Sequence, residues 1–273
     1  MIEALSYDFM QHALLAALLA SIACGIIGTL VVVNRLVFLA GGVAHAAYGG
    51  VGLAFYFGLP VLPCTLGFSV ATSLIMADIA RRDRQRADAA IGVLWAAGMA
   101  AGIILLDLTP GYNVDLMSYL FGSIMAVPAG DLWLMAGLDA VIVSAVAYFY
   151  QPLLVASFDE EYAAARGVPA RLLYLLLIAM AAVTVVMLIR IAGLILVIAL
   201  LTLPTFAAAR TARTMGGMMF ASTLWSMVFC LCGLWLSYMF NLTSGAAIIA
   251  AGVACVCVTA AASRLRRART AAL

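Results

Sequence analysis

The fold class follows from the apolar stretch LVFLAGGVAHAAYGGVGLAFYF, which occupies residues 36–57 and contains no Asp, Glu, Lys or Arg. A helix of about 20 such residues is long enough to cross the hydrocarbon core of a bilayer. The preceding segment, residues 9–33, has the same character. Within lipid every backbone polar group must be satisfied inside the protein, and long uninterrupted apolar runs achieve this as helices. Both stretches therefore predict transmembrane helices.

The composition extends this interpretation to the whole chain of 273 residues, of which 67% are apolar and 10% are charged. A soluble domain ordinarily has about a quarter charged residues. We expect an all-α membrane protein, a polytopic bundle of about nine transmembrane helices, with residues 1–273 forming one domain. A short apolar segment at 116–127 is expected to be interfacial or re-entrant. The expected spans are residues 9–33, 36–57, 60–79, 89–106, 131–150, 171–189, 191–209, 217–240 and 245–262.

The arginines predict how the bundle is oriented. If the C-terminus lies inside, the inner segments include the runs RRDRQR (81–86) and RLRRAR (264–269), and Arg190 is the one arginine outside. This asymmetry satisfies the positive-inside rule. We therefore expect the N-terminus outside and the C-terminus in the cytoplasm. Glu3 and Asp8 stand where a cleavable signal peptide has basic residues, so none is expected.

Several activities are excluded or disfavoured. The chain contains no lysine, and a Walker A loop requires one, so any ATP must be bound by another chain. There is no His-Glu-x-x-His or Gly-x-Ser-x-Gly motif and there are two histidines in all, which argues against a membrane-embedded enzyme. The six cysteines all fall in apolar stretches, where cysteine acts as a small apolar residue.

A capped helix is predicted in the inner segment between the fifth and sixth spans, residues 151–170. Asp159 is placed to cap it, Glu160 and Glu161 occupy its first turn, and Gly167 and Pro169 end it. Acidic residues at its start favour the helix dipole. The segment is either an ordinary amphipathic connector or a surface that a partner protein grips.

Two ionisable residues lie near the middle of their spans, His45 in the second and Asp139 in the fifth. Such groups are costly in hydrocarbon and are functional candidates by default. Gly41, Gly42 and Gly49 lie about one turn from His45 and share its face, so another backbone could approach there or a narrow route could open. We expect these five residues to line an ion path, with His45 and Asp139 as transient metal ligands. The alternatives are a neutral His45 bonded to a backbone carbonyl, and an Asp139 that is protonated or paired with Ser144 or Tyr148.

Five stretches, in order along the chain, resemble the permeases of metal-transporting ABC importers. They are NRLVFLAGGVAHAAYGGVGLA (34–54), DLMSYLFGS (115–123), FDEEYAAARGVP (158–169), RIAGLILVIALLTLPTFAAAR (190–210) and LSYMFNLTSGAAII (236–249). The resemblance implies a fold like that of type II ABC importers and a homodimer in a bacterial or archaeal inner membrane. It also implies an ATP-binding subunit on the cytoplasmic side and an extracytoplasmic metal-binding protein.

By this resemblance the coupling helix that contacts the ATPase comprises Phe158, Asp159, Glu160, Glu161, Tyr162, Arg166 and Gly167. The family commonly has an acidic residue one turn before the histidine, where this chain has Gly41, and Asp139 could supply the missing carboxylate. Arg190 is expected either to dock the metal-binding protein or to reach lipid headgroups.

The expected function is thus the permease of an ATP-driven divalent-metal importer. It has no resident cofactor and no nucleic-acid partner, and its cargo is the metal ion. Zinc is the favoured ion, although imidazole with one carboxylate suits manganese or ferrous iron as well. A permease for a metal chelate and a secondary transporter are the alternatives.

Overall fold

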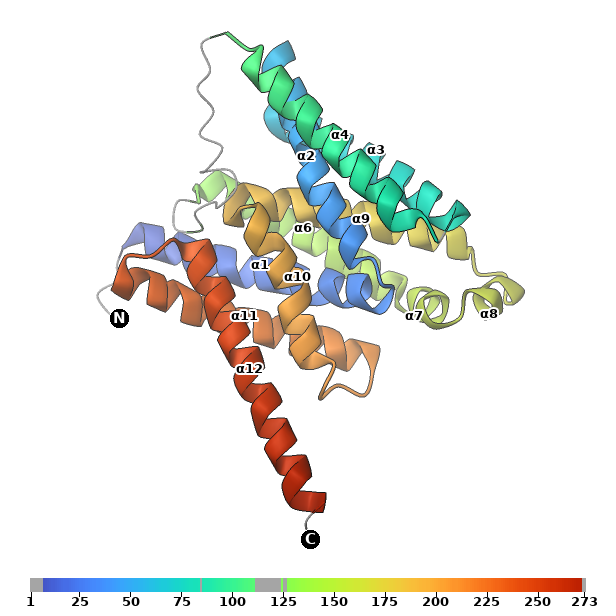
Figure 1. The fold of residues 1–273 in the computed structure, drawn as a ribbon, viewed down its shortest axis with the longest axis vertical. Helices are drawn as coiled ribbons and strands as arrows, with labels where there is room; N and C mark the ends of the chain where they lie inside the picture. The colour runs from blue at the N-terminus through green and yellow to red at the C-terminus, as the bar shows by residue number, and fades with distance from the viewer. Residues whose placement is uncertain (1–6, 84, 111–123, 125–126, 272–273) are drawn as a thin grey trace.

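The structure, a computed structural model, describes residues 7–83, 85–110, 124 and 127–271, and its regular elements in these ranges are all helices (Figure 1). With the labels of Figure 1 they are α1 (Asp8–Val33), α2 (Val37–Phe57), α3 (Val61–Arg82), α4 (Ala87–Asp107), α6 (Ala129–Tyr148), α7 (Tyr150–Phe158), α8 (Glu160–Ala165), α9 (Ala170–Ala192), α10 (Leu194–Ala208), α11 (Met215–Phe240) and α12 (Ser244–Ala271). The segment 116–127 lies almost wholly outside the described residues, so its placement stays a prediction.

The expected all-α membrane bundle is confirmed. In the described ranges, seven helices have the length and composition to cross a membrane: α1, α2, α3, α4, α6, α9 and α11. Two shorter apolar helices, α10 and the Ser244–Ala260 part of α12, match the remaining expected spans. A count of nine is therefore approximate. α10 is short because Gly193, with φ of 78°, breaks the chain away from α9 immediately before it.

One helix was not expected. The fifth span was predicted to end at residue 150, but α6 ends at Tyr148 and α7 begins at Tyr150 after a turn at Phe149. The apolar run continues through this turn without a Gly to mark it, and Pro152 lies in the first turn of α7, where proline is tolerated. Hydrophobicity alone therefore gave no signal for the break.

Helix α2 lies at the centre of one part of the bundle, packed against α3 and α4 with further contacts to α9 and α10. Figure 1 shows α2, α3 and α4 together in the upper part of the view. α1 packs against α11, α10, α6 and α9. The largest contact of α2 is with α4, where the Gly52 and Gly102 backbones touch directly, and a Cβ on either glycine would overlap the other helix. Small residues permit this close approach of membrane helices.

Polar contacts gather at one end of the bundle, which we call the arginine-rich end. Asn34, just after α1, donates from its Nδ2 atom to the Ser157 Oγ atom of α7 at 3.0 Å. The end of α3 and the start of α9 lie here too, because Arg81 pairs with Glu160 and Arg171 pairs with Asp78. The Tyr150 hydroxyl accepts a hydrogen bond from the Gly216 backbone N–H at 2.9 Å, which ties the start of α7 to the start of α11.

The glycine contact generates a test of the fold. We expect Gly102→Ala to lower the free energy of unfolding by about 1–3 kcal/mol, the usual cost of overpacking, because the added Cβ would lie 2.8 Å from the Gly49 nitrogen. Gly92→Ala, on the same helix, is the matched control, because a Cβ there meets no atom within 4 Å. Thermal unfolding of both variants in detergent measures the difference, and equal melting temperatures would contradict the packing described.

Candidate functional site

Helix α8 is a short, separately capped helix at the arginine-rich end. Asp159 adopts an extended backbone, and its side chain accepts a hydrogen bond from the Tyr162 N–H at 2.8 Å. At the other end Gly167 takes a φ of 75°, in the left-handed region that favours glycine. The Val168 N–H then bonds back to the Ala163 carbonyl at 2.9 Å. The capped helix predicted from the sequence is therefore confirmed, with Asp159 capping its start and Gly167 ending it as expected.

Most of α8 faces outward. Ala163 is its buried residue, whereas Tyr162 is 47% exposed and Phe158, the last residue of α7, is 71% exposed. Arg166 lies over Tyr162 and donates from Nε to the Tyr162 hydroxyl at 2.9 Å. Exposed aromatic side chains beside arginine are enriched at protein–protein interfaces. Glu161 and Gly167 are also exposed, so the outer surface of α8 can contact a partner.

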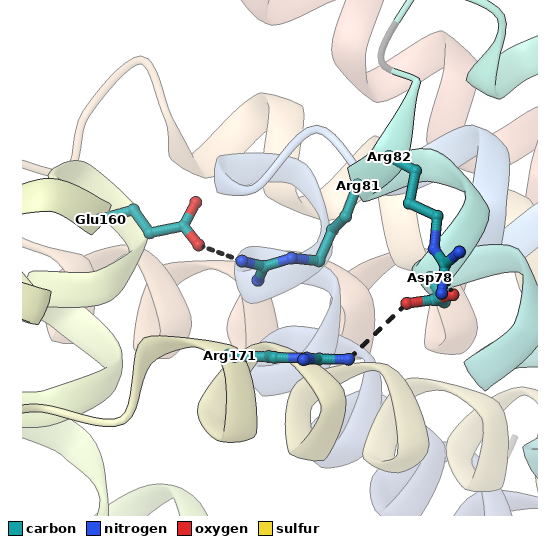
Figure 2. A network of polar contacts seen from close by, with 5 residues as sticks. All are labelled: Asp78, Arg81, Arg82, Glu160 and Arg171. Carbon is teal, nitrogen blue, oxygen red and sulfur yellow. Dashed lines mark hydrogen bonds and ion pairs between the residues drawn. The ribbon is translucent and has the colours of Figure 1, made fainter.

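The inner surface of α8 is attached to the bundle by charged groups that Figure 2 shows at close range. Arg81 Nη2, at the end of α3, lies 2.6 Å from Glu160 Oε1, so Glu160 points toward the bundle. Asp78, on the same helix as Arg81, contacts two arginines. Its Oδ2 lies 2.8 Å from Arg82 Nε and its Oδ1 lies 3.7 Å from Arg171 Nη2 of α9. Four charged residues thus connect α3 with α8 and α9.

A polar cavity of about 990 Å³ opens beside this network. Its walls come from the α1–α2 turn, the end of α3, the start of α4, the α7–α8 segment and the start of α9. The residues with polar groups on it include Asn34, Arg81, Asp88, Ser157, Glu160 and Tyr174. Because of this cavity, α8 contacts the bundle at only part of its surface and is not closely packed against it.

His45 lies on α2 with its ring stacked on Trp95 of α4, at a centroid distance of 4.2 Å and an interplanar angle of 15°. The Nδ1 atom is buried and has no hydrogen-bond partner among the described residues, so the structure gives that nitrogen no backbone carbonyl. The residue is only half-buried, although its neighbours along α2 are buried. His45 therefore presents part of an imidazole at mid-span.

The glycines around His45 divide into two groups. A Cβ at Gly42 would lie 2.7 Å from Ile91, and one at Gly49 would lie 2.5 Å from Phe68, so α4 and α3 fill the space beside them. A Cβ at Gly41 would meet only Ile198, at 3.7 Å. Close packing thus occupies the space beside Gly42 and Gly49, and their place on an ion route stays a prediction. Gly41 keeps space beside the histidine.

Asp139 lies elsewhere in the bundle. It is 7% exposed and faces a small cavity of about 10 Å³ lined by residues of α1, α6 and α9, including Ala23 and Thr184. Its Oδ2 atom has no hydrogen-bond partner in the described part of the chain. α6 packs against α1, α7 and α9, whereas His45 contacts α4. The residues around Asp139 do not include His45, and the expectation that the two share a metal site stays a prediction.

Arg190, at the end of α9, is not a free cation. Its Nε atom lies 3.0 Å from the Asp131 Oδ2 atom at the start of α6, and its side chain is 45% exposed. The sequence predicted Arg190 at the outer end of the bundle but gave no sign of its pairing with Asp131. The pair ties α6 to α9 at the end of the bundle opposite α8.

Sequence reasoning also missed Trp95 as the neighbour of His45 and Arg81 as the partner of Glu160. Both residues were visible, a tryptophan within the fourth span and an arginine at the inner end of the third. The missing information was which helices are adjacent. A pattern of apolar residues places a side chain along a helix axis but not next to a particular neighbour.

Comparison with known proteins gives consistent results over nearly the whole chain. An uncharacterised membrane protein of Synechocystis sp. is 52% identical over 91% of this chain and 89% of its own length. The manganese transport system membrane protein MntC of Halalkalibacterium halodurans is 30% identical over 90% of this chain and 85% of its own. The solved structure of PsaBC from Streptococcus pneumoniae in complex with Fab superposes with a TM-score of 0.85, at 29% identity, over 94% of this chain and 93% of that one.

The sequence profile of the ABC 3 transport family matches residues 6–263. This match, the relatives and the shared architecture agree, and the chain belongs to the ABC 3 transport family.

Proposed function

We propose that this chain is the membrane-spanning permease of an ATP-driven importer for a divalent metal ion, and that manganese is its cargo. The observation that carries the proposal is the end-to-end similarity to a protein named as a manganese transport system membrane protein, which covers 90% of this chain. The resemblance of PsaBC in fold and sequence supports the same class. Because the chain lacks lysine and hence a Walker A loop, ATP hydrolysis belongs to a partner subunit.

Manganese replaces zinc as the favoured ion. Zinc was favoured on the sequence, but two similar proteins that are named for a specific ion are named for manganese. Carbonyl and water oxygens suit manganese, whereas an imidazole ligand suits zinc and iron. The choice of manganese therefore rests on these relatives, and an open site with few protein ligands lets a transported ion leave.

The ion path is proposed to pass His45 and Gly41. A half-buried imidazole at mid-span is costly if it faces lipid. A second copy of the chain covering this face would remove that cost and would place two copies of His45 beside a shared path. This supports the homodimer expected from the resemblance. Asp139 is buried among residues of α1, α6 and α9 and is left out of the metal site.

The partner subunits are proposed to bind at opposite ends. The positive-inside rule places the arginine-rich end in the cytoplasm, so Phe158 at the end of α7 and Tyr162 and Glu161 of α8 face the ATPase there. Arg190 then lies outside, where it can meet a metal-binding protein. Its ion pair with Asp131 places this docking surface where α6 begins and α9 ends.

Metal uptake tests the proposed function. We expect cells that lack this chain to lose high-affinity uptake of ⁵⁴Mn²⁺ and to regain it when the gene is restored, while excess unlabelled Mn²⁺ competes more strongly than Zn²⁺. The empty vector is the control. Restoration of ⁶⁵Zn²⁺ uptake without ⁵⁴Mn²⁺ uptake would return zinc as the cargo, and restoration of neither would contradict a metal permease.

The docking role of Arg190 can be separated from its ion pair. Asp131→Asn breaks the pair but keeps the cation, whereas Arg190→Gln removes both. If Arg190 contacts the metal-binding protein, only Arg190→Gln should weaken binding, by up to about fivefold at low ionic strength, and less as salt screens the charge. Binding of the purified metal-binding protein to the solubilised complex measures this. Equal losses in the two variants would show that Arg190 acts only by holding α6 to α9.

A further inference from the structure

A continuous set of contacts leads from α8 to the helix that carries His45. It begins at the ion pair between Glu160 of α8 and Arg81 of α3. The two side chains come from elements separated by 79 positions in the sequence. Figure 2 shows them pointing toward one another across the gap between their helices. The pair is therefore a link between α8 and the bundle that is independent of the chain connection.

We propose that the Arg81–Glu160 ion pair is the joint through which the ATPase moves α3 and, through α3, the ion-binding helix α2. The inference rests on the proposed function, because it takes α8 as the element that the ATPase displaces. It assigns the positioning role to two particular side chains. The ATPase contacts Phe158, at the end of α7, and Tyr162 of α8, and Glu160 transmits the displacement of α8 to Arg81.

The geometry at Arg81 suits a joint. The guanidinium lies 2.6 Å from Glu160 Oε1 and also over the ring of Tyr174 on α9, 5.2 Å from its centroid. An arginine can hold a carboxylate and stack on an aromatic face at once because its guanidinium is planar. Arg81 is thus fixed on two sides, so a displacement of Glu160 is transmitted to α3 instead of being absorbed by a freely rotating side chain.

The receiving end of α3 is attached to α9 by a second charged contact. Asp78 Oδ1 lies 3.7 Å from Arg171 Nη2, at the start of α9. α8 and α9 are joined by the short segment around Gly167, whose left-handed backbone lets the chain change direction. A displacement of α8 therefore moves the start of α9 and the end of α3 together.

Helix α3 is packed too closely against α2 to move without it. A Cβ on Gly50 of α2 would lie 2.7 Å from the Thr65 Cα atom of α3, and the backbone of α2 rests on the Phe68 side chain at Gly49 and Gly50. Close-packed contacts of this kind switch between discrete arrangements and do not deform smoothly. Movement of α3 thus reaches the stretch of α2 that begins one turn after His45.

The ion pair is suited to switching rather than to holding the fold together. Its side chains are 31% and 42% exposed, at the edge of the polar cavity. Partly exposed ion pairs contribute little to stability, so removing this one should leave the bundle folded. The consequence of removal should appear in the coupling between ATP hydrolysis and transport.

The test uses the complete transporter, purified through a tag on this chain and reconstituted in proteoliposomes with its metal-binding protein. Mn²⁺ is the probe, and both Mn²⁺ transported and ATP hydrolysed are measured. Arg81→Glu and Glu160→Arg each bring like charges together, and the double variant restores an opposite pair. Arg86→Glu is the matched control, because Arg86 is a nearby arginine whose ion pair with Asp83 involves neither α8 nor α9.

We expect each single variant to assemble and hydrolyse ATP but to transport about fivefold less Mn²⁺ per ATP, a typical coupling between contacting residues. The double variant should recover most of the loss, and Arg86→Glu should match the native ratio. An unchanged ratio of Mn²⁺ transported to ATP hydrolysed in the single variants would contradict the proposed role of the ion pair. No recovery in an assembled double variant would contradict it too. If a reversed charge prevents assembly, Arg81→Gln and Glu160→Gln give the same comparison, and their combined loss should not exceed either single loss. The native complex tests the proposed function separately, because it must transport Mn²⁺ before any variant is compared.

Discussion

The structure depends on the close approach of α2 to α3 and α4. Lipid provides no hydrophobic force that drives one membrane helix against another, so association relies on van der Waals contact between well-fitted surfaces. Glycines on α2 and α4 bring the two backbones into direct contact at Gly52 and Gly102. That contact places Trp95 of α4 against the His45 ring, and the neighbouring contact at Gly50 fixes α3. The position of His45 and its link to the arginine-rich end both follow from this packing.

Features that depend on local sequence were predictable. The spans follow from apolar length, and α8 follows from an acidic cap at Asp159 and a terminating glycine at Gly167, each of which acts within a few residues. Features that depend on neighbouring helices were not. His45 and Asp139 have similar predicted depths but face different helices, and the glycines beside His45 fit either a route or a packing surface until α3 and α4 are placed. Arg190 illustrates the same limit, because its outer position was predicted and its contact with Asp131 was not.

The two ends of the permease have different kinds of surface for different tasks. At the arginine-rich end the α7–α8 segment presents exposed aromatic side chains on one surface, and Glu160 of α8 pairs with Arg81 on the other, at the edge of a cavity of about 990 Å³. This combination allows α8 to contact a partner while it stays linked to α3. At the opposite end an ion pair between Arg190 and Asp131 joins α6 to α9. Mid-span, His45 offers a single imidazole, which is suited to weak ligation of a passing ion.

The central claim is that the transported ion contacts His45 of α2 as it crosses the membrane. Electron spin echo spectroscopy of Mn²⁺ bound to the nucleotide-free complex tests it directly, because an imidazole ligand imposes a nitrogen modulation on the echo. We predict this modulation in the native complex and in His12→Ala, which changes the chain's other histidine, and its loss in His45→Ala. An unchanged nitrogen modulation in His45→Ala, or bound Mn²⁺ without nitrogen modulation in the native complex, would contradict the account.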